Sequence, residues 1–408
     1  MKKYFLAVAS FFIYSHISLG QVYPGQMDST FVPVRSHHYD PELTFDFCVN
    51  EPAWSNQAGI HSAFGSTDRL YFRKEVPVNH DNDLSSSYST TVWRGERANA
   101  QILVWSSEAL EQVRVSTQDL RSAEGNIIPK DRITFELVRY VLSNYPYAEK
   151  KAICGESPYK SGFLMPDRFE TLDRFDLPSQ TTRPVWMMVD VPRGTVPGTY
   201  KGQVEVRAKG KAPQLLNLEI VVQNQLLPYP KDWKYRLDLW QNPWAVAWYN
   251  HVEPWSPEHK MLLKQHLKHY ADAGGTYITT YGVHSPWSDN SYMIEGGMIE
   301  WIKKADGTWA FDYKIFDEYV ELAMECGIDE AITLYTPIPW GFRHRYKDEA
   351  TGDYSYINWA PSSEEFKKMW NIFLTDFKFH LEAKSWLDIT YIGINENPME
   401  ETLAAINV

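Results

Sequence analysis

The sequence of 408 residues is poor in cysteine and has no excess of basic residues. Its three cysteines, Cys48, Cys154 and Cys326, lack the close spacing of metal ligands, so we expect buried thiols and no zinc site. A Cys48–Cys154 disulfide stays open as an alternative. The 40 Lys and Arg residues are outnumbered by 52 Asp and Glu residues, which gives a net charge of −12 and argues against a nucleic-acid partner. We predict neither a metal nor a cofactor.

Long apolar runs are also missing beyond the first twenty residues, so we expect no membrane span. Residues 1–20 have the features of a secretory signal peptide: Lys2 and Lys3, a short apolar stretch, and the small residues Ser18 and Gly20 at a cleavage site. No cysteine follows that site, which argues against a lipid anchor. We therefore predict export to the periplasm or the exterior, without a lipid anchor.

Aromatic residues are abundant, with 16 Trp, 25 Tyr and 19 Phe in the chain. Such residues fill protein cores, and they also stack on flat apolar faces such as those of sugar rings. Their position along the chain is needed to separate the two uses.

Residues 21–230 have the pattern of an antiparallel β-sandwich. Short alternating segments recur without a strong helix between them, and turn residues such as Pro197-Gly198 separate them. The predicted strands are 70–76, 100–105, 133–138, 185–191, 200–206 and 216–222. We interpret this domain as architectural.

Residues 231–408 alternate strands and helices, which is typical of a (β/α)₈ (TIM) barrel. We predict strands at 235–240, 276–281, 331–335 and 389–394, and helices from Pro257, Tyr313, Ser362 and Pro398. Hairpin-like inserts are expected near Asp306-Gly307 and Gly352. Only about four βα units are present, so we expect a partner or a missing C-terminal segment to complete the barrel.

The residues that end each predicted strand are mostly aromatic rings and amides. In a parallel barrel these ends form one site, and rings around a carboxyl group are a recurrent way to hold a sugar. The predicted substrate-binding residues are Trp240, Gln241, Tyr281, His284, Trp287, Tyr335 and Trp340.

Asn395 and Glu396 follow the fourth strand and are the predicted catalytic residues. A glutamate whose pKa is raised by aromatic neighbours can protonate a glycosidic oxygen. If the sugar carries a 2-acetamido group, that group can itself attack the anomeric carbon, and Asn395 would orient it. The alternative is a helix N-terminus, with Asn395 as the cap and Pro398 in the first turn.

Four segments make the sequence resemble secreted bacterial proteins of glycoside hydrolase family 123. They are Trp93–Gln101, Asp238–Pro243, Trp309–Tyr313 and Tyr391–Glu400. The resemblance implies a β-sandwich on a (β/α)₈ catalytic domain, and retaining, substrate-assisted cleavage of terminal β-linked N-acetylgalactosamine. It also implies an adjacent Asp-Glu pair after strand four, in which Glu396 matches the acid/base.

Asn395 stands where that family has Asp, so the positive charge of an oxazolinium intermediate would lack its carboxylate. We expect weakened activity. A catalytically impaired or truncated carbohydrate-binding protein that keeps the aromatic cleft remains the alternative, and a scaffold whose sandwich is the working part is a third.

Overall fold

The structure is a computed structural model that describes residues 51–77, 84–143, 163–286 and 296–407, with the short strands β1 (Met27–Asp28), β2 (Phe31–Pro33) and β3 (Glu42–Leu43). The chain divides into two compact units, Met1–Leu227 and Pro228–Val408. The sequence placed this boundary between 230 and 231. The predicted signal peptide, Cys48, Cys154 and Trp287 lie outside the described residues. In the part that is described, no helix is long and apolar enough to span a membrane.

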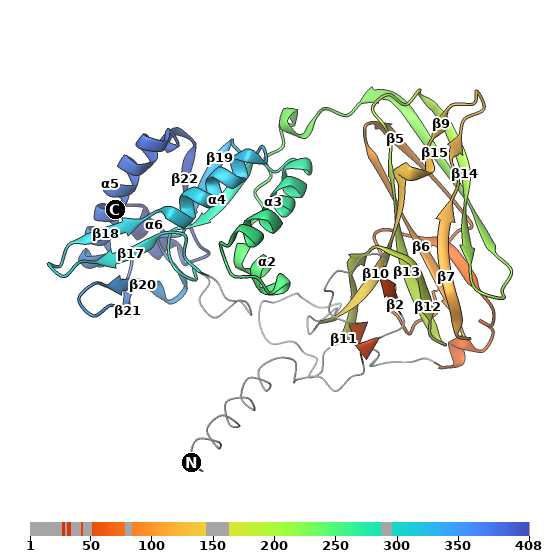
Figure 1. The fold of residues 1–408 in the computed structure, drawn as a ribbon, viewed down its shortest axis with the longest axis horizontal. Coiled ribbons are helices and arrows are strands. Elements are labelled where there is room, and N and C mark those ends of the chain that lie inside the picture. Colours follow the sequence, from red (N-terminus) through yellow and green to blue (C-terminus); the bar gives the residue numbers. More distant parts are fainter. Residues whose placement is uncertain are drawn as a thin grey trace, which may run out of the picture. The chain divides into compact units, whose positions relative to one another are not determined.

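The first unit contains two β-sheets that face each other (Figure 1). One has the strand order β11-β10-β13-β6-β4 and the other β2-β12-β7-β14-β15-β5, with β8 and β9 at its side. The strands are β4 (His61–Gly65), β5 (Ser87–Arg94), β6 (Arg97–Ser106), β7 (Leu110–Thr117), β8 (Leu120–Arg121), β9 (Ile127–Ile128), β10 (Ile133–Ser143), β11 (Phe163–Glu170), β12 (Leu172–Leu177), β13 (Thr181–Asp190), β14 (Gly198–Arg207) and β15 (Gln214–Leu226).

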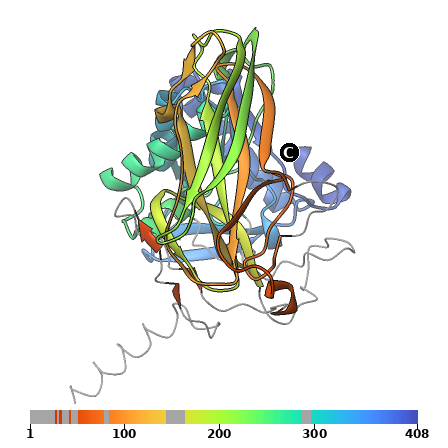
Figure 2. The same ribbon diagram turned by 90° about the vertical axis from the view of Figure 1, so that its right-hand side faces the viewer.

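Alternation along the strands explains the core between these sheets. Ile102 and Val104 of β6 are fully buried against Val204 and Val206 of β14, because every second side chain of a strand points to the same face. The long strands run side by side in Figure 2. The prediction of antiparallel sheets in this part of the chain is confirmed, with the exception that β5 pairs with β15 in parallel.

The prediction of a strand over Leu70–Val76 is wrong. The backbone makes a turn there, in which the Glu75 N–H donates to the Phe72 carbonyl at 3.2 Å. Tyr71 and Arg73 are nevertheless buried. The alternation of apolar and polar residues therefore indicates burial at this segment and not a strand. The Thr182 N–H of β13 donates to the Arg73 carbonyl at 2.8 Å without forming a regular ladder.

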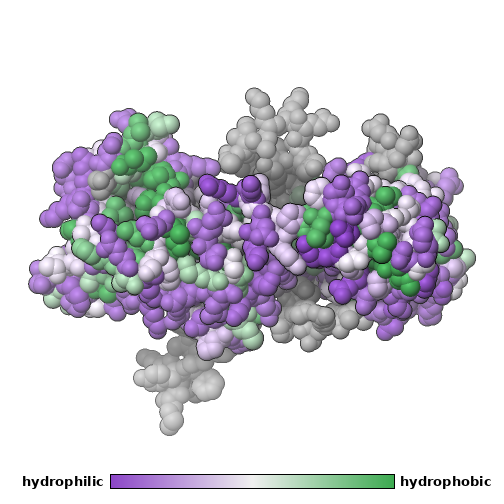
Figure 3. Space-filling view, turned by 90° about the horizontal axis from the view of Figure 1, so that it is seen from above, coloured by the Kyte–Doolittle hydropathy of each residue, from purple (hydrophilic) through white to green (hydrophobic). Residues whose placement is uncertain are grey.

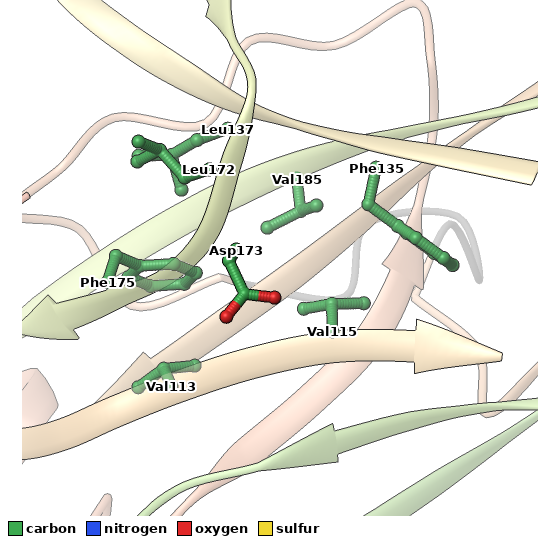
Figure 4. Close-up of a pocket in the computed structure, with 8 residues that line it drawn as sticks. All are labelled: Val113, Val115, Phe135, Leu137, Leu172, Asp173, Phe175 and Val185. Atoms are coloured by element: carbon green, nitrogen blue, oxygen red, sulfur yellow. The ribbon is translucent and has the colours of Figure 1, made fainter. Parts of the chain in front are cut away.

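A small cavity opens between the sheets of the sandwich (Figure 4). Its volume of about 20 Å³ has room for roughly one water molecule. The lining is apolar apart from Asp173, which pairs with Arg114 at 2.9 Å. The other lining residues are Val113, Val115, Phe135, Leu137, Leu172, Phe175 and Val185. A space of this size cannot hold a sugar.

The second unit is a mixed α/β region built on the parallel sheet β16-β19-β22. Its elements are α2 (Pro243–Asn250), α3 (Pro257–Asp272), β16 (Tyr277–Tyr281), β17 (Glu300–Lys303), β18 (Trp309–Asp312), α4 (Lys314–Glu325), β19 (Ala331–Tyr335), β20 (Arg343–Asp348), β21 (Tyr354–Asn358), α5 (Glu364–Lys384), β22 (Thr390–Gly393) and α6 (Met399–Ile406).

Local signals start and stop these helices. The Ser363 hydroxyl accepts the Phe366 N–H at 3.1 Å at the start of α5, and Ser256 caps α3 in the same way. The predicted inward residues of α4, which are Phe316, Tyr319, Val320 and Ala323, are all buried.

Two features of this unit differ from the sequence prediction. The segment 235–240 forms no strand, only a single parallel bridge between Leu237 and Gly275. The two predicted inserts join into one sheet, β18-β17-β20-β21, because β17 pairs with β20 in parallel. Among the described residues the parallel strands do not close into a barrel.

Figure 3 shows hydrophilic residues over most of the drawn face, with apolar residues gathered in a few places.

Candidate functional site

Strand register brings Tyr335 and Asn395 together at the carboxyl ends of β19 and β22. In the parallel pair of β19 and β22, Tyr335 lies opposite Gly393. Asn395 follows Gly393 by two residues. The Tyr335 hydroxyl donates a 2.7 Å hydrogen bond to Asn395 Oδ1. Both residues are buried, with 1% and 5% of their surface exposed. The aromatic ring and the amide therefore form one unit below the surface.

The side-chain oxygen of Asn395 has both of its hydrogen-bonding positions occupied. Its Oδ1 accepts the Glu396 backbone N–H at 2.8 Å in addition to the Tyr335 hydroxyl, and its Nδ2 donates to the Ile338 carbonyl at 3.4 Å. The Asn395 N–H donates to Thr336 Oγ1 at 3.2 Å. An amide oxygen has two lone pairs, and both are used here. These bonds fix the orientation of Asn395.

The helix-cap alternative for Asn395 is wrong. Helix α6 begins at Met399, its N-cap residue is Pro398, and no side chain caps it. Asn395 lies before that helix and makes its hydrogen bonds to Tyr335, Thr336 and Ile338 instead.

The Glu396 side chain is exposed. None of the hydrogen bonds found among the described residues involves its carboxylate. The enclosure by aromatic rings that we expected is therefore not present in the described part of the chain. The carboxylate is open to a ligand that approaches from solvent.

Trp240 presents an exposed ring beside this pair. Its ring centroid lies 4.7 Å from that of Tyr335, at an angle of 48° between the planes. Because 51% of Trp240 is exposed, its exposed surface can stack on a sugar face while its ring packs on Tyr335. Trp240, Tyr335, Asn395 and Glu396 thus form a continuous chain of contacts.

Tyr281 differs from its predicted role, because it is completely buried. Its ring stacks on Trp244 at 5.4 Å, and its hydroxyl donates to the Gln241 carbonyl at 2.5 Å. A ring in this position cannot stack on a sugar. Tyr281 instead holds the backbone next to Trp240, and the same correction applies to the buried ring of Tyr335.

The segment that carries His284 is hydrogen-bonded to Trp340 at Pro286. The Trp340 N–H donates to the Pro286 carbonyl at 3.0 Å, and 38% of Trp340 is exposed. His284 is partly buried. Burial, together with the charges of Arg345 and Arg343, lowers the pKa of His284 to about 4. The imidazole is therefore neutral at neutral pH.

Sequence reasoning missed two polar residues of this region. The Asn397 Nδ2 donates to the same Ile338 carbonyl as Asn395, at 3.1 Å. Asp238 accepts the hydroxyl of Thr279 at 3.0 Å and that of Thr333 at 3.4 Å. Both residues lie inside the quoted motifs at 238–243 and 391–400, which was the signal that could have found them. No cluster of three metal-ligating side chains occurs in the ranges that the structure describes.

Two family models match the chain. One, described as the catalytic domain of glycoside hydrolase 123, matches residues 240–408, and the other, described as its N-terminal domain, matches residues 64–208. The chain belongs to glycoside hydrolase family 123. Both models carry the description of a glycoside hydrolase.

A solved family 123 structure from Clostridium perfringens is similar to this family 123 chain. That structure describes the details of glycolipid glycan hydrolysis by a family 123 glycoside hydrolase. The TM-score is 0.76 at 26% sequence identity, over 86% of this chain and 60% of that one. The chain thus spans less than two thirds of the length of that relative.

Other solved structures are much less similar to this family 123 chain. A PapD-like domain of human CEP192 covers 45% of it at 12% identity, with a TM-score of 0.22, and is itself covered to 99%. A GH5 xyloglucanase from Bacteroides ovatus covers 79% at 10% identity, with a TM-score of 0.20, and is covered to 58%. These values carry no argument. Among curated proteins, none matches the sequence.

Proposed function

We propose that this family 123 chain removes a terminal β-linked N-acetylhexosamine, with N-acetylgalactosamine favoured, from a glycan outside the cytoplasm. The observation that carries the proposal is the exposed Glu396 carboxylate directly after the buried Asn395 amide, with the exposed Trp240 ring nearby. The similar clostridial structure concerns hydrolysis of glycolipid glycans, which is the same class of substrate.

In the proposed mechanism the substrate supplies the nucleophile. Glu396 protonates the glycosidic oxygen as the acetamido carbonyl oxygen attacks the anomeric carbon and the glycosidic bond breaks. This gives an oxazolinium ion. Glu396 then takes a proton from water, and the water oxygen attacks the anomeric carbon and reopens the ring. Two displacements at one carbon retain its configuration.

Asn395 is the residue that we propose to orient the acetamido group, and its hydrogen bonds limit how well it does so. Both lone pairs of Oδ1 are occupied by Tyr335 and the Glu396 N–H. An acetamido N–H must therefore displace or share one of these donors. Asn395 also carries no charge to stabilise the oxazolinium ion. Slow turnover is the expected consequence.

The test measures release of an aryl group from aryl N-acetyl-β-galactosaminide. Glu396→Gln is expected to lower kcat by at least about a hundredfold, the usual contribution of a general acid. Glu400→Gln, at an exposed position in the first turn of α6, is the matched control and should leave kcat unchanged. Equal rates for Glu396→Gln and the unsubstituted chain would refute the role of Glu396.

Both lone pairs of the Asn395 side-chain oxygen already accept hydrogen bonds. This favours one alternative, a protein that binds the same glycan without cleaving it. Calorimetry with an N-acetylgalactosamine-terminated oligosaccharide separates the two functions. Binding without product, with affinity lost in Trp240→Ala and kept in Glu396→Gln, would support the binding protein. Product formation that depends on Glu396 would support the enzyme.

A further inference from the structure

The hairpin β20–β21 places basic side chains on one solvent-facing side. Arg343, Arg345 and Lys347 alternate along β20 with His344 and Tyr346, so they lie on the face opposite His344. His344 is 2% exposed and belongs to the core, whereas Arg343 and Lys347 are exposed. Neither Asn395 nor Glu396 belongs to this face.

Both arginines lie over tyrosine rings of the partner strand β21. The Arg343 guanidinium carbon is 3.7 Å from the Tyr356 ring centroid, and that of Arg345 is 4.2 Å from the Tyr354 centroid. Both tyrosines are about half exposed, at 48% and 49%. Stacking restricts a guanidinium through its face and leaves its N–H edge available, which suits bidentate binding of a carboxylate or sulfate.

The charges on this face are only partly compensated. Glu300 lies 3.7 Å from Arg345, and its other carboxylate oxygen accepts the Tyr354 hydroxyl at 2.8 Å. Among the described residues Arg343 has no carboxylate within ion-pair distance. The pKa of His284, in the segment after β16, is lowered mainly by burial and also by the charges of Arg345 and Arg343. This positive face is unusual in a chain whose net charge is −12.

The chain also connects this face to the candidate site. Ile338, whose carbonyl binds Asn395 and Asn397, and the exposed Trp340 lie in the segment that leads directly into Arg343. A glycan that places its terminal sugar near Glu396 and Trp240 can extend along this segment. The arginines would then meet a sugar beyond the one that is cleaved.

We propose that Arg343 and Arg345, held on Tyr356 and Tyr354, form a subsite for an anionic group of the glycan, a carboxylate or a sulfate ester, next to the terminal sugar. The proposal rests on the proposed function, because it assumes a glycan whose terminal sugar occupies the site at Glu396. The preferred substrate is accordingly an acidic glycan.

The experiment is calorimetry on the full chain with three oligosaccharides that end in the same N-acetylhexosamine. One is neutral, one carries a carboxylate on the penultimate sugar, and one carries a sulfate ester there. We expect one anionic glycan to bind about tenfold more tightly than the neutral one at low salt, as charge-assisted hydrogen bonds do. The tighter of the two identifies the anion. Arg343→Gln should remove the preference.

Arg207→Gln on β14 is the control, because it changes the net charge equally at an exposed position outside this face. Tyr356→Phe should keep the preference and Tyr356→Ala should weaken it, since the ring and not the hydroxyl supports Arg343. Equal binding of neutral and anionic glycans, or a preference that survives Arg343→Gln, overturns the subsite alone. Absence of binding and hydrolysis for all three overturns the proposed function as well.

Discussion

Asn395 is held by four neighbours at once, and this makes its environment sensitive to single atoms. Tyr335, the Glu396 N–H, the Ile338 carbonyl and Thr336 each contribute one hydrogen bond. The sequence predicted that residues 395 and 396 lie at a strand end. It could not predict that the amide would be buried with both lone pairs of its oxygen occupied, because Tyr335, Thr336 and Ile338 lie about sixty positions away in sequence.

Removing the Tyr335 hydroxyl tests this arrangement. Tyr335→Phe should lower the free energy of unfolding by about 1–2 kcal/mol, because Asn395 Oδ1 loses a buried donor. It should also change the affinity for N-acetylgalactosamine, since Asn395 is freed to rotate. Denaturant unfolding and calorimetry measure the two effects. Tyr346→Phe on β20 is the control, and equal stability of Tyr335→Phe and the unsubstituted chain would contradict the prediction.

A charge at position 395 is the second test at this scale. Asn395→Asp replaces Nδ2 by an oxygen that the Ile338 carbonyl repels, and it supplies a negative charge for an oxazolinium ion. We expect kcat on an aryl N-acetyl-β-galactosaminide to rise about tenfold, a modest part of what electrostatic stabilisation can contribute. Asn397→Asp, which changes the other amide on Ile338, is the matched control. An unchanged or lower kcat would count against the substrate-assisted mechanism.

At the scale of elements, helices and parallel strands were predicted better than the connections between them. Gly274 follows the C-terminus of α3 with a positive φ of 92°, which glycine adopts easily. Ser256 and Ser363 cap the N-termini of α3 and α5. Local chemistry therefore fixed these helix boundaries. The pairing of β17 with β20 joins two inserts that are distant in sequence. No local pattern indicates such a pairing.

His344 on β20 makes the junction with α5 dependent on pH. Its Nε2 accepts the Trp370 Nε1–H at 3.3 Å and its Nδ1 lies 3.0 Å from the Phe342 carbonyl, so the ring is neutral with its proton on Nδ1. Burial lowers the pKa of His344 to about 4. In the unfolded chain the pKa of this histidine is near 6.5. Between about pH 4 and pH 6.5 the unfolded chain therefore binds a proton at this histidine, whereas the folded chain does not.

The contribution of His344 to stability should therefore be constant above about pH 6.5 and fall by up to about 3 kcal/mol as the pH decreases to 4. Denaturant unfolding at pH 7 and pH 4.5 measures this loss. His344→Gln should reduce the difference between the two pH values, and His251→Gln, at an exposed position, should not. A pH difference that is the same in all three proteins would exclude His344 as its cause.

On the scale of the whole molecule, each unit has its own core. The buried cluster of the first unit contains residues between Ile60 and Val222, and that of the second contains residues between Trp244 and Ala405. The first of these clusters should therefore be sufficient for folding.

Residues 21–227 produced alone should then unfold cooperatively and show the circular dichroism of a β-protein. Thermal unfolding followed by circular dichroism and by tryptophan fluorescence checks this, with coincident transitions expected. As a control, Val204→Asp in the same fragment places a charge between the sheets and should prevent folding. A fragment that is unfolded without this substitution would show that the second unit is required.

The sequence by itself determined the features that depend on neighbours along the chain. Strand alternation, helical periodicity and turn residues predicted the two parts and most of their elements, since short-range propensity and burial set these patterns. The motif at Tyr391–Glu400 likewise pointed to Asn395 and Glu396. Only the tertiary structure decided that Tyr281 and Tyr335 are buried supports, that Glu396 is exposed, and that Arg343 and Arg345 stack on tyrosines. The first two depend on contacts between segments far apart in sequence, and the arginine stacking depends on the register of the β20–β21 hairpin. No local pattern fixes this register or burial.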